Sequence, residues 1–162
     1  MVRAAAGLAI PLSSIAATQS STDDGGIASR ALTASPQTSW PGTCTHTLTQ
    51  DAWWKATLTD SWTVSSITLT NRAGCCPERL QNLDIYVGDT KCASSVSVDG
   101  GATKTIPCVG TGTTIKVQHT TGTSHHSLTL CGFSAHGTPG ALAYYRPYSQ
   151  LQPALSPQQF MF

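Results

Sequence analysis

Two adjacent cysteines, Cys75 and Cys76, set the tightest constraint on how this chain can fold. They are flanked by Arg72 and Arg79, in a sequence of which only 10% is charged. Joined to each other, the two cysteines would close a small, rigid ring, because neighbouring Cα atoms lie only ~3.8 Å apart. The two guanidinium groups would offer planar forks of hydrogen-bond donors beside it. On local chemistry alone, a small-ligand site is favoured no more than its alternatives. In those alternatives each cysteine bonds to a distant partner or stays reduced, and the two arginines are ordinary surface residues.

The chain contains six cysteines, an even number without a CxxC pair. This pattern favours a disulfide framework over a zinc ribbon, and we therefore expect a secreted, extracellular protein. Six cysteines can pair in fifteen ways, so the residues alone leave the connectivity open. Neither asparagine, Asn71 nor Asn82, begins an N-glycosylation sequon, so the expectation of secretion rests on the cysteines.

Length and charge limit the classes of protein to consider. With 162 residues the chain is long enough for one domain with a sizeable core. A net charge of +1 without a basic run gives no indication of nucleic-acid binding. No apolar run approaches the ~20 residues of a membrane-spanning helix. The sequence does not determine the oligomeric state and is compatible with a homo-oligomer.

The hydrophobic pattern predicts an all-β fold, a single β-sandwich with short loops and disulfide staples. Short runs rich in β-branched and aromatic residues alternate with Gly, Pro, Ser and Asp clusters. We expect strands at 53–58, 62–70, 83–87, 113–118 and 127–133, and one helical turn at 28–32. Residues 1–9 read as a leader or weak signal-like segment, 10–137 as the domain, and 138–162 as a disordered Pro/Gln/Tyr-rich tail.

Several segments together resemble the F-type lectin (fucolectin) family over about residues 10–137. The likeness is carried by Ala17-Thr18-Gln19-Ser20-Ser21, Thr43-Cys44-Thr45-His46-Thr47, Trp53-Trp54, Leu69-Thr70-Asn71-Arg72, Cys75-Cys76, Glu78-Arg79-Leu80 and Leu128-Thr129-Leu130-Cys131. The resemblance implies a discoidin-like jelly-roll β-sandwich that binds L-fucose on fucosylated glycans. We expect that this binding requires no cofactor, although the resemblance also implies a structural calcium site, described below.

The resemblance also implies a set of ligand-binding residues. The family motif, a His followed by an Arg and then a second basic residue, falls on His46, Arg72 and Arg79. The arginines would donate to sugar hydroxyls and the ring oxygen, and His46 would add one more donor. A Cys75–Cys76 disulfide would pack against the sugar ring, and Trp40 would cover the C6 methyl group. This chain departs from the motif at Gly74, where the family has an Asp.

Three disulfides and a calcium site are implied in the same way. The pairings would be Cys44–Cys131, Cys75–Cys76 and Cys92–Cys108. The family calcium positions correspond to Arg30, Thr33, Ser35, Thr43, Cys131 and Gly132. Thr33, Ser35 and Gly132 replace an Asp, an Asn and a Glu, and calcium affinity depends on anionic oxygen ligands. We therefore expect calcium binding to be weak or absent.

Three functions are alternatives to a fucose-binding lectin. A glycosidase needs two carboxylates flanking the scissile bond, and Glu78, the one glutamate, has no suggestive acidic partner. We therefore expect that the protein is not an enzyme. A metal site from His125 and His126 with His119 or His136 is disfavoured, because adjacent strand residues point to opposite faces. The remaining alternative is a degenerate lectin fold that recognises proteins without binding sugar, because several acidic residues of the family are lost.

Overall fold

A computed structural model describes residues 7–122 and 127–140 of the chain. The leader to residue 6, His125, His126 and the tail from residue 141 lie outside the described residues. The elements in chain order are β1 (Leu8–Ala9), η1 (Leu12–Ser14), β2 (Ile15–Gln19), η2 (Ala28–Ala31), β3 (Trp53–Thr70), η3 (Pro77–Leu80), β4 (Leu83–Val87), β5 (Thr90–Val96), β6 (Thr103–His119) and β7 (Gly132–Pro139).

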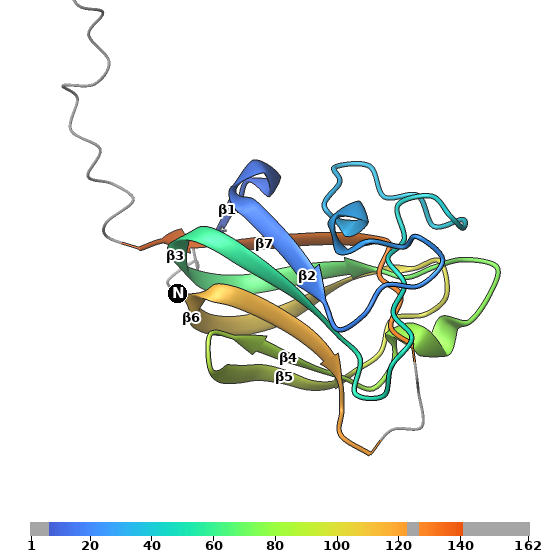
Figure 1. Cartoon of the computed structure of the whole chain (residues 1–162). Helices are drawn as coiled ribbons and strands as arrows, with labels where there is room; N and C mark the ends of the chain where they lie inside the picture. The colour runs from blue at the N-terminus through green and yellow to red at the C-terminus, as the bar shows by residue number, and fades with distance from the viewer. Residues whose placement is uncertain (1–6, 123–126, 141–162) are drawn as a thin grey trace, which may run out of the picture.

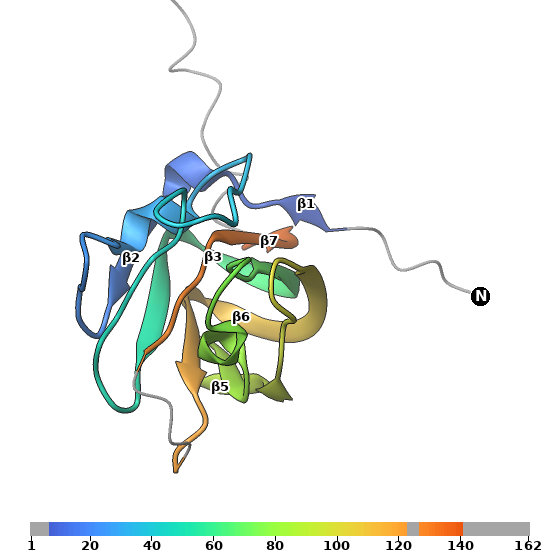
Figure 2. The same cartoon turned by 90° about the vertical axis from the view of Figure 1, so that its right-hand side faces the viewer.

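The strands form an antiparallel arrangement in the order β1-β7-β3-β6-β4-β5, with β2 paired to β3. The first half of β3 pairs with β2, and its second half pairs with β7, while β6 runs alongside both halves. The β3–β6 register shifts between Thr57 and Trp62 and again between Val64 and Ser66. Irregularities of this kind bend strands, and Figures 1 and 2 show β3 and β6 curving so that each contributes to both layers. The all-β sandwich prediction is confirmed.

The core lies between these layers. In β3 the buried residues occupy even positions from Trp54 to Val64, except at the exposed Asp60. They resume at Ile67 and Leu69, because the irregularity between Val64 and Ser66 shifts the phase of the side chains by one position. Trp54 is fully buried and its ring packs against Phe133 of β7, with ring centroids 4.7 Å apart. No helix in the described residues is long and apolar enough to cross a membrane.

The strand predictions need three corrections. The strands expected at 53–58 and 62–70 are one continuous strand, because the exposed residues 59–61 form a bend and not a turn. The strand expected at 113–118 is the end of β6, which begins at Thr103. Strand structure is also present on both sides of 10–137, because Leu8 and Ala9 pair with β7, and β7 itself continues to Pro139.

The strand expected at 127–133 is wrong over its first part. Leu128 and Leu130 lie opposite Thr47 and Thr45, and their carbonyls accept from the main-chain N–H groups of these threonines. The return bonds run instead to the threonine hydroxyls, from Leu128 N at 2.7 Å and from Leu130 N at 3.1 Å. Side-chain acceptors replace the main-chain acceptors of a regular ladder, so the strand begins only at Gly132.

All three disulfides implied by the family resemblance are present. Cys44 is bonded to Cys131, Cys75 to Cys76, and Cys92 to Cys108. The first joins residues 87 positions apart and ties the His46 segment to the start of β7. In a chain-entropy account a loop of this length contributes about 4–5 kcal/mol to stability.

Candidate functional site

The loops at one end of the sandwich bring the predicted ligand-binding residues together. η2, η3 and the long connections 20–52 and 71–82 lie at the end of the molecule opposite the N-terminal label in Figure 1. Each of the important side chains there is held by its own set of main-chain or side-chain hydrogen bonds.

Arg72 is positioned by its buried neighbour Asn71. The Asn71 side-chain amide donates to the carbonyls of Pro77 at 3.0 Å and Val98 at 2.7 Å. Its carbonyl oxygen accepts from the Arg72 N–H at 2.7 Å. Asn71 therefore fixes the exit of β3, the start of η3 and the Arg72 main chain at once. The pattern of strands gave no indication of this role.

Arg79 lies in η3, the short 3₁₀ turn that follows the paired cysteines. Cys76 precedes this turn in a left-handed conformation, with φ 59° and ψ 46°. The carbonyl of Arg79 accepts from the buried His119 Nε2 at 3.2 Å and from Thr129 N at 3.4 Å. The Arg79 main chain is thus tied to β6 and to the segment before β7. This contact also gives His119 a structural role.

His46 projects from an extended segment that is hydrogen-bonded on both sides. Thr45 and Thr47 are fully buried toward 128–130, so His46, between them, points the opposite way. Its N–H donates to the carbonyl of Gly26 at 2.8 Å, and its carbonyl accepts from Asp23 N at 3.0 Å. A Cβ at position 26 would lie 2.5 Å from His46 N, so this close approach requires glycine.

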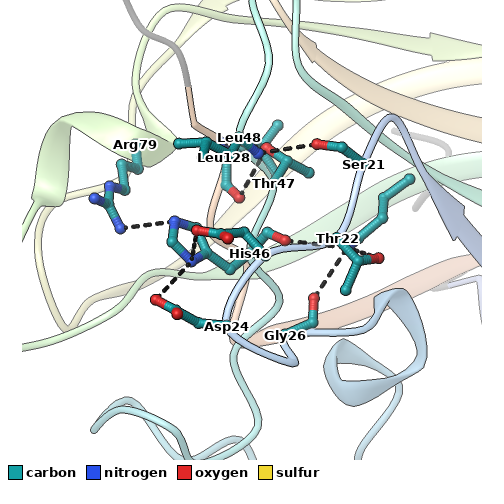
Figure 3. A network of polar contacts seen from close by, with 11 residues as sticks. Ser21, Thr22, Asp24, Gly26, His46, Thr47, Leu48, Arg79 and Leu128 are labelled. Atoms are coloured by element: carbon teal, nitrogen blue, oxygen red, sulfur yellow. Dashed lines mark hydrogen bonds and ion pairs between the residues drawn. The ribbon is translucent and has the colours of Figure 1, made fainter.

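The predicted residues form a continuous chain of contacts. Nη1 of Arg79 lies 3.1 Å from Nε2 of His46, as Figure 3 shows. The His46 ring meets the edge of Trp40 with centroids 5.6 Å apart. The guanidinium carbons of Arg72 and Arg30 lie 5.1 Å and 5.8 Å from the Trp40 ring centroid. The site therefore combines aromatic surface with cationic donors, two of which, Nη1 of Arg30 and Nε of Arg72, are buried without a hydrogen-bond partner.

The contact with Arg79 determines the hydrogen-bonding role of His46. A guanidinium can only donate, so Nε2 must accept, and the neutral ring carries its proton on Nδ1. This differs from the donor role expected for His46. Burial lowers the pKa of His46 below its ordinary value, and the Arg79 cation lowers it further, against the opposing effect of two nearby carboxylates. The neutral ring is therefore favoured at neutral pH.

Those carboxylates belong to Asp23 and Asp24, for which the sequence predicted no role in the site. Their Oδ2 atoms lie 3.6 Å and 3.8 Å from Nδ1 of His46. Asp24 has a φ of 47°, a left-handed conformation that Asp tolerates better than most residues. The sequence signal that could have revealed them is weak, because nothing in the turn 23–26 indicates that it folds back onto His46.

The paired cysteines lie next to these residues in the chain. Cys75 is exposed and Cys76 is half-buried, so the disulfide presents sulfur to solvent directly before η3. Gly74 has a φ of 79° with no atom near its absent side chain. The family Asp would therefore meet no clash at this position, although the backbone conformation favours glycine.

The residues at the family calcium positions do not fit that ion well. The Thr43 hydroxyl donates to the Cys131 carbonyl at 2.6 Å, so one of the oxygens implied as a ligand already accepts a hydrogen bond. Thr33 Oγ1 accepts from Ser35 N at 3.2 Å. Arg30 brings a guanidinium, and Gly132 offers no side chain. None of the six positions carries a carboxylate, whereas calcium sites rely on anionic oxygens.

Comparison with known proteins shows which family the chain belongs to. A family model for F5/F8 type C domains, described as a NedA-like, galactose-binding domain, matches residues 24–124. The chain belongs to this family. The match includes Trp40, His46, Arg72 and Arg79, and it ends just after β6, before β7.

Individual relatives of this F5/F8 type C domain include several lectins. Fucolectin-4 of Anguilla japonica is 34% identical over 76 residues, which cover 41% of this chain and 42% of the relative. The chain thus spans less than half the length of this curated relative. The solved fucolectin from striped bass (Morone saxatilis) serum is 28% identical with a TM-score of 0.72, over 80% of this chain and 49% of that one. A fucose-binding module of Streptococcus pneumoniae is 25% identical with a TM-score of 0.66, over 81% and 96%.

Proposed function

We propose that this chain is a lectin domain that binds L-fucose on fucosylated glycans and catalyses no reaction. The observation that carries the proposal is the chain of contacts from Arg79 through His46 and Trp40 to Arg72, beside the exposed Cys75–Cys76 disulfide. The similarity to fucolectins and to a fucose-binding module supports it.

The chemistry of the site suits a small deoxy sugar. The two arginines donate to hydroxyl oxygens, and Nε2 of His46 accepts from a hydroxyl once Arg79 turns to the sugar. Trp40 and the disulfide offer apolar surface to the methyl group and the ring edge. Each hydrogen bond to a charged group contributes about 1.5–3 kcal/mol. A few such bonds, less the cost of association, correspond to a dissociation constant in the micromolar range.

Retention of the oxidised protein on immobilised L-fucose, with immobilised D-galactose as the comparison, tests this function. We expect retention on fucose and release by free fucose. Galactose is the informative control because the family description names that sugar. Passage through the fucose column without delay would overturn the proposal and favour a protein-recognition module. A glycan array would then define the fucosylated glycans that bind.

The proposal includes an extracellular location. The three disulfides of this domain are of the kind that persists in oxidising compartments. Alkylation of the protein immediately on isolation from its source, followed by mass analysis, checks this location. All six cysteines should resist alkylation; labelled thiols in the native protein would contradict it.

A further inference from the structure

The side of His46 that faces away from Arg79 has a feature that the sugar site does not use. His46 is 6% exposed, and its Nδ1 is buried without a hydrogen-bond partner. This nitrogen faces Asp23 and Asp24, and one ligand atom from each of the three residues lies within 4.8 Å of the others. Figure 3 shows the ring between Arg79 on one side and Asp24 on the other.

We propose that Asp23, Asp24 and His46 bind a zinc ion through two carboxylate oxygens and Nδ1 of the imidazole. Zinc takes imidazole nitrogen at about 2.0–2.1 Å and carboxylate oxygen at about 2.0–2.2 Å, usually with tetrahedral geometry. Ligand atoms around such an ion lie roughly 3.4 Å apart, an estimate from these bond lengths. The distances from Nδ1 to the two carboxylates, 3.6 Å and 3.8 Å, are close to this spacing.

The ligands are held in place before any ion arrives. The turn 23–26 is bonded to His46 through Asp23 N and Gly26 O. Gln19 reinforces it, because its amide nitrogen donates to the carbonyls of Gly26 at 2.9 Å and His46 at 3.2 Å. The Asp24 side chain is 70% exposed, which leaves water access for the fourth position of the ion. The nitrogen ligand favours zinc over calcium or magnesium, which prefer oxygen.

Zinc binding at this position would change the side of His46 that faces the sugar site. An ion on Nδ1 takes the lone pair there, so the ring proton must move to Nε2. Nε2 then becomes a donor and can no longer accept from Arg79, which is released. The proposed zinc site does not depend on the proposed function. The effect of zinc on sugar binding, in contrast, rests on the proposed function. By linkage, any change in fucose affinity caused by zinc equals the change in zinc affinity caused by fucose.

Calorimetric titration of Zn²⁺ into chelator-treated, oxidised protein tests the site without sugar. We expect one ion bound per chain, with affinity at least about tenfold weaker in Asp24→Asn and lost in the Asp23→Asn/Asp24→Asn double variant. Asp89→Asn, in an exposed turn between β4 and β5, is the matched control and should bind as the parent does. Zinc binding that survives the double variant, or no binding by the parent, would overturn the proposal.

A spectroscopic measurement follows the proton on the ring. The ¹⁵N chemical shifts of the His46 ring should report an Nδ1–H tautomer without metal and an Nε2–H tautomer with zinc. An unchanged tautomer at saturating zinc would also overturn the site. Fucose binding is measured separately on the same samples. Zinc binding without fucose binding would refute only the proposed function, and fucose binding without zinc binding only the metal site.

Discussion

The hydroxyl of Thr43 donates to the main-chain carbonyl of Cys131 at 2.6 Å and links the same two segments that the Cys44–Cys131 disulfide joins. Thr43 also accepts from Gln37 N at 2.8 Å, so its hydroxyl both donates and accepts within the protein. A covalent bond and a hydrogen bond therefore connect the loop before His46 to the start of β7. In the resemblance to fucolectins, these segments are the ones that a calcium ion would join.

Calcium should contribute little to the stability of this domain. Stabilisation by a ligand follows RT ln(1 + [L]/Kd), which is small when the dissociation constant is near the millimolar concentration used. We expect the melting temperature in millimolar calcium and in excess EGTA to agree within about 2 °C. A rise of many degrees with calcium would show that main-chain oxygens alone hold the ion.

Replacement of Arg79 should remove sugar binding and leave the fold intact. Arg79→Ala deletes a charged donor worth about 1.5–3 kcal/mol, which lowers fucose affinity at least about tenfold. The side chain is half-buried at the surface, so the melting temperature should change little. Lys104→Ala, an exposed cation on β6, is the control and should keep parental affinity. Equal fucose affinity in Arg79→Ala and the parent would contradict the assignment of Arg79 to the fucose site.

Stability should depend on pH through His46 in the metal-free protein. Burial and Arg79 lower its pKa in the folded state, with Arg72 adding to them and Asp23 and Asp24 opposing. As the pH falls, the unfolded chain takes up the proton first, near the ordinary value of about 6.5. The contribution of His46 to the free energy of unfolding is thus complete above about pH 6.5 and is lost as the pH falls through the lowered pKa.

Melting temperatures in EDTA between about pH 7.5 and 5 measure this dependence. His46→Gln retains a polar side chain that does not titrate, so its melting temperature should fall less over the same range. Parallel curves for the parent and His46→Gln would mean that other groups cause the pH dependence. EDTA removes any ion that would hold the imidazole unprotonated.

The hydrophobic pattern predicted the fold class, whereas the cluster of basic and aromatic residues was implied by the resemblance to fucolectins. Alternation along β4 is visible in the sequence, and so is the order of His46, Arg72 and Arg79. The continuity of β3 was missed because residues 59–61 are polar enough to read as a turn. In the fold they are exposed residues of β3 at the register shift between Thr57 and Trp62, and β6 pairs with β3 before and after them.

Contacts set by tertiary structure alone could not be predicted. The hydroxyls of Thr45 and Thr47 replace main-chain acceptors opposite 128–130. The local conformational preferences of threonine do not predict this replacement. Asp23 and Asp24 face His46 only because Gly26 lets the turn approach within van der Waals reach. The proton position on His46 depends in turn on Arg79, more than thirty residues away.

Asn71 should prove essential for stability and for the position of Arg72. Asn71→Ala leaves the carbonyls of Pro77 and Val98 without their donor in a buried position, which costs about 2–4 kcal/mol in the free energy of unfolding. Thr105→Ala is the control, because Thr105 pairs with Thr68 at 2.9 Å on the exposed surface and should cost below about 0.5 kcal/mol. Denaturant unfolding measures both; similar costs for the two variants would contradict the role of Asn71.

Partial reduction should affect sugar binding before it affects folding. Thiol–disulfide exchange requires access to sulfur, and Cys75 is exposed whereas Cys44 and Cys131 are fully buried. Under limiting reductant, alkylation and mass analysis should label Cys75 and Cys76 first. Fucose affinity should fall at this stage because reduction opens the Cys75–Cys76 ring, which offers apolar surface to the sugar. The melting temperature should stay near the parental value. First labelling at Cys44 and Cys131, or unfolding in step with the loss of binding, would contradict this order.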